Sequence, residues 1–242
     1  MAKSERKLFT VHGSIQYTAD DKFLYAEKDG VELRLDMFDR HYYKLRPYGN
    51  GIILEIDGLR MHLVKDFKSP LDYSKQVVRE LKIPTTGSFS ALDTCMGLGY
   101  TAIALAKQQS INLVITAELS EAVVALAKWN PFSDPLFQKE SKIMLMPGSI
   151  FDLIKNFESE TFSFAIHDPP RISHASELYS PEFYSQLYRV CKTGARIFHY
   201  VGSVGVSKGR KIEKEVASRL ESAGFSNLRY SLRLQGIFGT KP

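Results

Sequence analysis

The feature that most constrains the fold of this chain is a repeated alternation between short apolar runs and helical patterns over residues 89–225. The apolar runs are SALDT, NLVITAEL, KIMLM, FSFAIH and ARIFHYVG, and each is followed by a segment with helical spacing of apolar residues. Strands that are apolar along their whole length are typical of parallel sheets covered by helices on both faces. We therefore expect a doubly wound, mostly parallel α/β sheet. Residues 227–238 are expected to end it as one bent strand or a hairpin.

A different pattern precedes this alternation. Residues 8–66 alternate apolar and polar side chains, with turn signals at Lys28–Gly30, Gly49–Gly51 and Asp57–Gly58. This pattern predicts short antiparallel strands joined by hairpins. At Ser69 the period becomes helical, with Ser69 as N-cap and Pro70 at the first helical position. The sequence thus predicts a small β-rich N-terminal module over residues 1–68 and an α/β domain over residues 69–242.

Composition narrows the class of protein. The chain has 242 residues, a formal net charge of +5 and two cysteines. Two cysteines in different segments predict neither a disulfide framework nor a zinc cluster, and we expect no metal and a reducing cytosol. No apolar stretch reaches the ~18 residues of a membrane span, and the N-terminus has no apolar core of a signal peptide. A cytoplasmic protein is expected. The mild positive charge is compatible with a polyanionic partner and does not identify one.

Three strand-to-helix turns carry a pattern typical of nucleoside sites. The first strand of the expected sheet ends in LDTCMGLGYTAIAL, where Gly97 and Gly99 allow a tight turn before a helix N-terminus. The next strand ends at Glu118, which is placed to accept hydrogen bonds from a ribose, or to sit favourably at a helix N-terminus. The third turn contains Gly148 and Ser149, either an adenine contact or a simple N-cap. The pattern does not distinguish NAD from S-adenosylmethionine.

The stretch FSFAIHDPPRIS ends a predicted core strand in an acid followed by two prolines. A carboxylate there is costly unless it is paired or faces a cleft. In doubly wound sheets, ligands bind beyond the carboxyl ends of the strands, which favours a ligand-facing role for Asp168 over a turn cap. His167 is either a general base or a satisfied strand-end histidine, and we favour the second.

The order of elements and these motifs resemble the class I S-adenosylmethionine-dependent methyltransferases, over about residues 70–242. The stretches LDTCMGLGYTAI, HDPPR and FHYVG are most similar to a little-characterised set of predicted archaeal methyltransferases. The resemblance implies a Rossmann-like methyltransferase sheet and S-adenosyl-L-methionine as cofactor. It implies cofactor contacts from Asp93, Cys95, Gly97, Gly99, Tyr100, Thr101, Glu118, Leu119, Gly148 and Ser149. Two positions depart from the family pattern: Cys95 replaces the usual first glycine of the loop, and Ser149 stands where an aspartate is common.

The resemblance also implies catalytic roles for residues of HDPPR, namely Asp168, Pro169, His167 and Arg171. In related enzymes that act on amines, the acid and a proline carbonyl accept the hydrogens of the amine, and an aromatic residue follows. Arg171 occupies that aromatic position here, where a guanidinium can stack on a base or pair with a phosphate. The first hypothesis is a methyltransferase acting on an amino group, with RNA as a candidate acceptor.

Other functions remain open at this point. An aminopropyl transferase of the polyamine synthase type shares the fold, although Arg171 beside Asp168 argues against a polycation. A non-catalytic nucleoside- or RNA-binding protein is a third class, and a nicotinamide dehydrogenase is the least favoured. The glycine-rich segment 201–211 carries three basic residues and is expected on the ligand side, as a phosphate contact or a solvated helix start. The sequence specifies neither the acceptor nor the oligomeric state.

Overall fold

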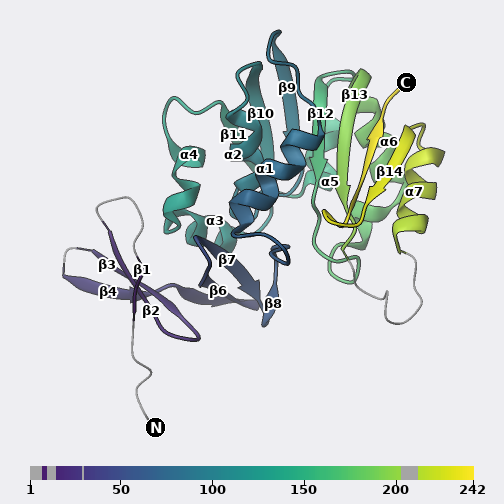
Figure 1. The fold of residues 1–242 in the computed structure, drawn as a ribbon. Coiled ribbons are helices and arrows are strands. Elements are labelled where there is room, and N and C mark those ends of the chain that lie inside the picture. Colours follow the sequence, from purple (N-terminus) through teal and green to yellow (C-terminus); the bar gives the residue numbers. More distant parts are fainter. Residues whose placement is uncertain (1–6, 10–14, 29, 203–211) are drawn as a thin grey trace.

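The computed structural model describes residues 7–9, 15–28, 30–202 and 212–242 of the chain (Figure 1). In these residues the strands form three sheets. The largest has seven strands in the order β11-β10-β9-β12-β13-β15-β14 and makes up the C-terminal part of the protein. Two four-stranded sheets, β1-β2-β3-β4 and β5-β6-β7-β8, precede it in sequence.

The seven-stranded sheet is parallel from β11 to β13. Its parallel strands are β9 (Phe89–Asp93), β10 (Ile111–Glu118), β11 (Ile143–Pro147), β12 (Phe162–His167) and β13 (Cys191–Tyr200). The chain enters the sheet at the interior strand β9, proceeds to β10 and β11, and then crosses to β12 on the other side of β9. This reversal places the topological switch point between β9 and β12, where a ligand is expected at the carboxyl edge. The predicted fold class is confirmed.

The end of the sheet is antiparallel. Strand β15 (Gly236–Thr240) lies between β13 and β14 (Ser226–Ser231) and pairs antiparallel with both. Of the two alternatives expected for residues 227–238, the hairpin is therefore the one that forms. The segment 201–211 that we expected to meet phosphates lies outside the described residues, apart from Val201 and Gly202.

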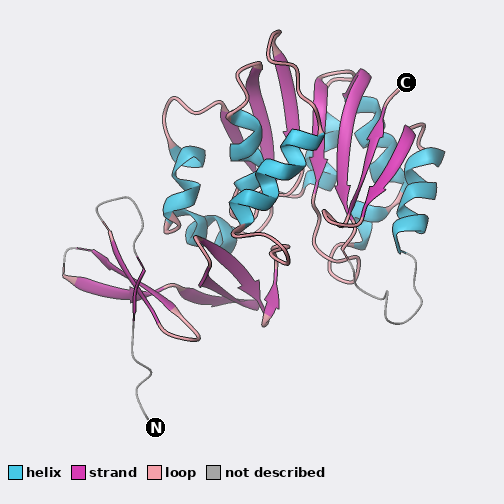
Figure 2. Cartoon of the chain, in the orientation of Figure 1, coloured by secondary structure: helices cyan, strands magenta, loops and turns pink. Residues whose placement is uncertain are grey.

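Helices cover both faces of this sheet (Figure 2). The α-helices are α1 (Pro70–Glu80), α2 (Tyr100–Ala106), α3 (Glu121–Lys128), α4 (Asp134–Phe137), α5 (Ile150–Leu153), α6 (Pro181–Val190) and α7 (Ile212–Ser222), with 3₁₀ turns at Pro131–Ser133, Ile154–Asn156 and Ser176–Tyr179. One hydrophobic cluster joins the sheet to α1, α2 and α3, and a second joins it to α5, α6 and α7. The predicted serine caps are present, since the hydroxyls of Ser69 and Ser120 accept hydrogen bonds from the first turns of α1 and α3. No helix in the described ranges is long and apolar enough to cross a membrane.

The N-terminal strands are antiparallel, as predicted, but they form two sheets. The strands are β1 (Lys7–Phe9), β2 (Gln16–Ala19), β3 (Leu24–Lys28), β4 (Val31–Arg34), β5 (Asp36–Asp39), β6 (His41–Tyr48), β7 (Gly51–Ile56) and β8 (Leu59–Arg60). Each sheet is a meander in which consecutive strands pair. The predicted turn glycines Gly49 and Gly58 have φ values of 52° and 76°, which a residue with a Cβ rarely adopts.

The N-terminal sheets and the α/β part share one core. Leu45 and Ile52 of the second sheet belong to the same buried cluster as Val77 of α1 and Leu126 of α3. Two hydrogen bonds cross the junction. The Tyr17 hydroxyl donates to the carbonyl of Trp129 at 2.9 Å, and the Tyr100 hydroxyl donates to the carbonyl of Ile52 at 2.7 Å. The division at residue 68 stays a prediction.

Candidate functional site

The tips of β9, β10 and β12 converge at the carboxyl edge of the large sheet. Asp93, the last residue of β9, pairs in register with Thr116 of β10 and Ile166 of β12. The next residues of each segment therefore leave the sheet side by side. The glycine turn, Glu118 and Asp168 are brought together at one edge, as the sequence predicted.

The glycine turn has the backbone that its sequence requires. Gly97 and Gly99 have φ values of 54° and 77°, so the left-handed conformations fall on glycines. A Cβ at Gly99 would collide with the Leu136 side chain, whereas a Cβ at Gly97 would meet nothing within 4 Å. Gly97 thus borders open space in front of the N-terminus of α2. Because Cys95 keeps a negative φ, its Cβ fits the first loop position without backbone strain.

Glu118 holds this turn in place. Its carboxylate accepts hydrogen bonds from the backbone N–H of Gly97 at 3.0 Å and from that of Ser120 at 2.9 Å. Burial raises the pKa of Glu118, and these N–H donors oppose that shift. Glu118, the acid expected to bind a ribose, therefore also links the end of β10 to the loop after β9. Leu119 beside it is 71% exposed at the same edge.

Asp93 faces inward. It is fully buried, and its two carboxylate oxygens accept hydrogen bonds from the hydroxyls of Thr101 and Thr116, both at 2.7 Å. Burial raises the pKa of Asp93 to about 7, against the effect of the two hydroxyls. Asp93 and Thr101 thus tie the end of β9 to α2 beneath the turn. Their expected role as direct cofactor contacts gains no support from this geometry.

The Tyr100 side chain points toward the N-terminal sheets. Besides bonding to the Ile52 carbonyl, its hydroxyl accepts a hydrogen bond from the Asn130 amide at 2.9 Å. The ring is buried and lies 5.3 Å from that of His62. Tyr100 therefore joins the two parts of the protein, which gives no support to a side-chain contact with a cofactor.

The third turn lies beside Glu118. Gly148 has a φ of 123°, and its N–H donates to the carbonyl of Glu118 at 2.9 Å. Ser149 occupies the N-cap position of α5, but its side chain makes no capping hydrogen bond. The hydroxyl is partly exposed and is free to contact a ligand at this edge. The adenine contact remains a prediction for Ser149.

Asp168 presents its carboxyl group at the tip of β12. It is half-buried, and no described Lys, Arg or His nitrogen lies within ion-pair distance of its carboxylate. Burial and, to a smaller extent, the charge of the neighbouring Asp93 raise the pKa of Asp168 to about 7. Such a carboxyl group is poised to accept a proton or a hydrogen bond near neutral pH.

Three tyrosines lie near the carboxyl group of Asp168. Burial and then the charge of Asp168 raise the pKa values of Tyr73 from α1, Tyr179 from the loop before α6 and Tyr200 from the end of β13. The Tyr179 hydroxyl donates to the carbonyl of Pro170 at 3.0 Å, which fixes the Pro-Pro segment. Burial also raises the pKa of the Cys95 thiol, which lies near enough to Asp168 to feel its charge. Asp168 therefore lies near three tyrosines and has no ion-pair partner among the described residues.

His167 is a structural residue, and the general-base role does not fit its geometry. Its Nε2 donates to the carbonyl of Leu178 at 3.0 Å, so its Nδ1 accepts from the Thr94 hydroxyl at 2.7 Å. Both ring nitrogens are engaged, the side chain is buried, and burial holds its pKa well below the usual range. The ring packs edge-on against His199, with centroids 4.4 Å apart.

The other two residues of HDPPR differ in exposure. Pro169 is buried, whereas Arg171 is exposed and makes no ion pair with Asp168. The argument that Arg171 beside Asp168 disfavours a polycation is therefore weakened. Arg171 lies near enough to Tyr200 to lower the pKa of that hydroxyl, against the larger effect of burial.

Sequence reasoning missed the three tyrosines near Asp168, and it missed Thr94. Tyr200 ends a strand next to β12, so the rule that ligands bind beyond strand ends would have identified it. Tyr73 reaches the site from α1 and gave no local signal. Thr94 ends the predicted strand SALDT without any signal of a role, and only the fold shows that it bonds to His167.

The sequence of this chain is similar to that of an archaeal protein. No protein-family model matches the chain. The chain is 41% identical over 224 residues to the uncharacterized protein MJ1233 of Methanocaldococcus jannaschii, covering 92% of this chain and 75% of that protein.

Solved structures share the fold at low sequence identity. Spermidine synthase in complex with the transition-state analogue AdoDATO superposes with a TM-score of 0.68 at 16% identity, over 88% of this chain and 77% of that one. Spermidine synthase from Thermotoga maritima gives a TM-score of 0.67 with the same identity and coverage. A candidate S-adenosyl-L-methionine-dependent methyltransferase from Methanococcus maripaludis gives 0.52 at 16% identity, over 71% of this chain and 85% of that one.

Proposed function

We propose a function for this chain, which belongs to the same family as MJ1233 of Methanocaldococcus jannaschii and has the fold of S-adenosylmethionine-dependent transferases. The proposed reaction is transfer of a methyl group from S-adenosylmethionine to an amino group. The observation that carries this proposal is the position of Asp168. Its carboxyl group lies at the switch point of the sheet, beside the glycine turn, with a pKa of about 7 and no paired cation in the described chain.

The residues present fit the nucleoside donor. A Cβ at Gly97 would meet no atom within 4 Å, so open space lies beside this glycine. The N-terminus of α2, which follows the turn, offers N–H groups that have no partner within the helix. We assign the ribose to Glu118, at the end of β10, and the adenine to Ser149, in the turn after β11. When bound, S-adenosylmethionine supplies a methyl group on a sulfonium that is already activated for displacement.

The acceptor end is where the protein contributes chemistry. Asp168 accepts a hydrogen bond from the acceptor amine and so points the nitrogen lone pair at the methyl carbon. As the new C–N bond forms and the S–C bond breaks with its electrons going to sulfur, the nitrogen becomes positive. Its proton then passes to the Asp168 carboxylate, which a pKa near 7 permits. The aromatic rings of the nearby tyrosines would stabilise the developing positive charge on nitrogen.

A second candidate is transfer of an aminopropyl group. It is favoured by the superposition with the spermidine synthases, which includes the N-terminal sheets because it spans 88% of the chain. Asp168, which forms no ion pair with any described residue, is also compatible with a cationic acceptor. The same carboxyl group would then take the proton of the attacking amine.

Calorimetry with S-adenosylmethionine, decarboxylated S-adenosylmethionine and NAD identifies the donor. Transfer is then followed by mass spectrometry with RNA and small amines as acceptors, so that the mass added shows which group moves. Asp168→Asn should leave donor affinity nearly unchanged and lower single-turnover transfer by about 10²-fold, because a positioning and proton-accepting group is lost. Asp152→Asn is the control, since Asp152 is an exposed acid on α5 whose side chain pairs with Lys155. Full transfer by the Asp168→Asn protein would contradict the proposal.

A further inference from the structure

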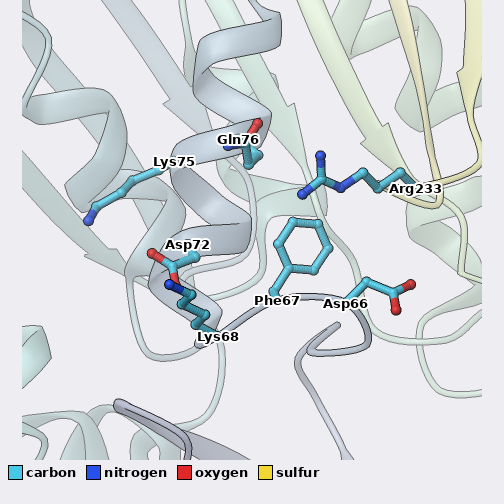
Figure 3. Close-up of a pocket in the computed structure, with 7 residues that line it drawn as sticks. All are labelled: Asp66, Phe67, Lys68, Asp72, Lys75, Gln76 and Arg233. Carbon is cyan, nitrogen blue, oxygen red and sulfur yellow. The ribbon is translucent and has the colours of Figure 1, made fainter.

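A cavity of about 320 Å³ lies outside the site described above (Figure 3). Three segments that are distant in sequence line it. They are the connection between β8 and α1 (Asp66, Phe67 and Lys68), the first turns of α1 (Asp72, Lys75 and Gln76) and Arg233 from the turn between β14 and β15. Its size suits a fragment of about a nucleotide, at the lower end of small-molecule sites.

An aromatic ring and a guanidinium form the centre of this cavity. Phe67 is buried, and the guanidinium carbon of Arg233 lies 5.2 Å from the centroid of its ring. Figure 3 shows the Arg233 side chain reaching toward the Phe67 ring, with Gln76 beyond its guanidinium group. Stacking on a ring fixes the guanidinium plane, so that its N–H fork is preorganised for an oxyanion.

The cavity adjoins the acceptor end of the site through one side chain. The ring of Tyr73 packs edge-on against Phe67, with centroids 5.3 Å apart. The Tyr73 hydroxyl donates to the carbonyl of Leu234, the residue after Arg233, at 3.0 Å. The charge of Asp168 also raises the pKa of Tyr73, so this buried side chain lies near the acceptor carboxyl group as well as near Phe67. The cavity and Asp168 are therefore neighbouring parts of the protein.

The charges of the lining favour an anion. Lys68, Lys75 and Arg233 are exposed, and none of them forms an ion pair within the described part of the chain. Of the two lining acids, Asp72 stands in the first turn of α1, where the helix dipole offsets its charge. Figure 3 shows the Asp66 carboxylate pointing away from Phe67. The side of the cavity next to Phe67 thus offers Arg233 and the Gln76 amide as donors.

We propose that this cavity binds a phosphate group of the acceptor substrate, with Arg233 as its main ligand and the buried Phe67 ring as the support that holds the guanidinium in place. The inference rests on the proposed function, because it names the acceptor as phosphorylated. Arginine binds phosphate through two parallel N–H···O bonds, whereas lysine acts as a point charge. The phosphate belongs either to an RNA strand or to a small phosphorylated molecule.

The test uses the full chain saturated with S-adenosylhomocysteine, so that the nucleoside site is filled. Uridine 5′-monophosphate, uridine and a short single-stranded uridine-rich RNA are titrated by calorimetry. The monophosphate should bind and uridine should bind at least about 10-fold more weakly, the scale of a lost charge-assisted pair of hydrogen bonds. Arg233→Ala should weaken the monophosphate by a similar factor, and Arg233→Lys should restore part of the loss. RNA that binds more tightly than the monophosphate, with the same Arg233 dependence, identifies RNA as the source; equal affinity identifies a small molecule.

Arg79→Ala is the matched control, because Arg79 is an exposed arginine on α1 that does not line the cavity. Equal effects of the Arg79 and Arg233 substitutions on binding of the monophosphate would overturn the inference. So would binding of propylamine that is lost in Asp66→Asn, since the cavity would then hold a cation. Failure of the proposed function is separate: it would appear as no binding of S-adenosylmethionine or S-adenosylhomocysteine in the unmodified protein.

Discussion

At the scale of single residues, three acids at neighbouring strand ends have different roles because their hydrogen-bond partners differ. Asp93 accepts from two threonine hydroxyls and is sealed in the core. Glu118 accepts from two backbone N–H groups and holds a loop. Asp168 has aromatic neighbours and no paired cation in the described chain, so its carboxyl group is the one left for a substrate.

Two glycines with nearly the same φ allow a test of the turn between β9 and α2. Gly99 and Gly58 have φ values of 77° and 76°, but a Cβ would collide with Leu136 only at Gly99. Gly58→Ala should cost about 1 kcal/mol of unfolding free energy, the penalty for a left-handed alanine. Gly99→Ala should cost about 2–4 kcal/mol, since overpacking adds to that penalty. Urea denaturation measures both; equal losses would mean that Leu136 moves aside.

The buried histidines predict how stability depends on pH. Burial lowers the pKa of His199 to about 3 from its ordinary value of 6.5, while its Nδ1 donates to the Tyr200 carbonyl and its Nε2 accepts from the Tyr184 hydroxyl. Below pH 6.5 the unfolded chain takes up a proton that the folded chain does not, so this contribution is present above pH 6.5 and is lost as pH falls toward 3.

His199→Gln should remove that dependence. Between pH 6.5 and 5 the unmodified protein should lose about 1–2 kcal/mol more unfolding free energy than the variant. The comparison is needed because Asp93 and Asp168, with pKa values raised to about 7, act in the opposite direction: their contribution falls as pH rises from about 4 to 7. Parallel curves for the two proteins would show that His199 is protonated in the folded state.

At the scale of elements, β10 controls the loop that follows β9. The Glu118 carboxylate bridges the N–H groups of Gly97 and Ser120, so removing it both loosens the turn and takes away the expected ribose acceptor. Glu118→Ala should weaken binding of S-adenosylmethionine by about 1–3 kcal/mol. Isothermal calorimetry measures this, and circular dichroism verifies the fold. Unchanged affinity would remove Glu118 from the cofactor site.

The elements themselves were largely predictable because their signals are local. Ser69 before Pro70, and Ser120 before an amphipathic run, mark helix starts because their side-chain hydroxyls accept hydrogen bonds from backbone N–H groups of the first helical turn. Gly97, Gly99 and Glu118 could be placed at one edge because parallel strands align their ends. The three tyrosines near Asp168 could not, since Tyr73 arrives from a helix that precedes the sheet. The inward orientation of Asp93 depends on Thr116 across the sheet, and such cross-strand pairing is not visible in one segment.

At the scale of the whole molecule, the shared core indicates that the N-terminal sheets and the α/β part unfold together. The single tryptophan, Trp129, lies at their junction, where its carbonyl accepts the Tyr17 hydroxyl. Tryptophan fluorescence and far-UV circular dichroism should therefore report one coincident urea transition. Separate transitions would show instead that residues 1–68 form an independent domain.

Tyr100→Phe tests the same junction from the other side. The substitution leaves the Ile52 carbonyl and the Asn130 amide without their hydroxyl partner, which should cost about 1–3 kcal/mol in the same urea experiment. The affinity for S-adenosylmethionine should stay unchanged, because the hydroxyl points away from the glycine turn. A loss of affinity with full stability would return Tyr100 to the cofactor site.

The position of β15 has a consequence for synthesis in the cell. This strand lies inside the sheet, between β13 and β14, yet it is made after both. Until residue 240 has emerged from the ribosome, β13 has an open edge and β14 has no partner. The nascent chain therefore exposes the edge of β13 until β15 has been made, and this half of the sheet is protected from aggregation only after that.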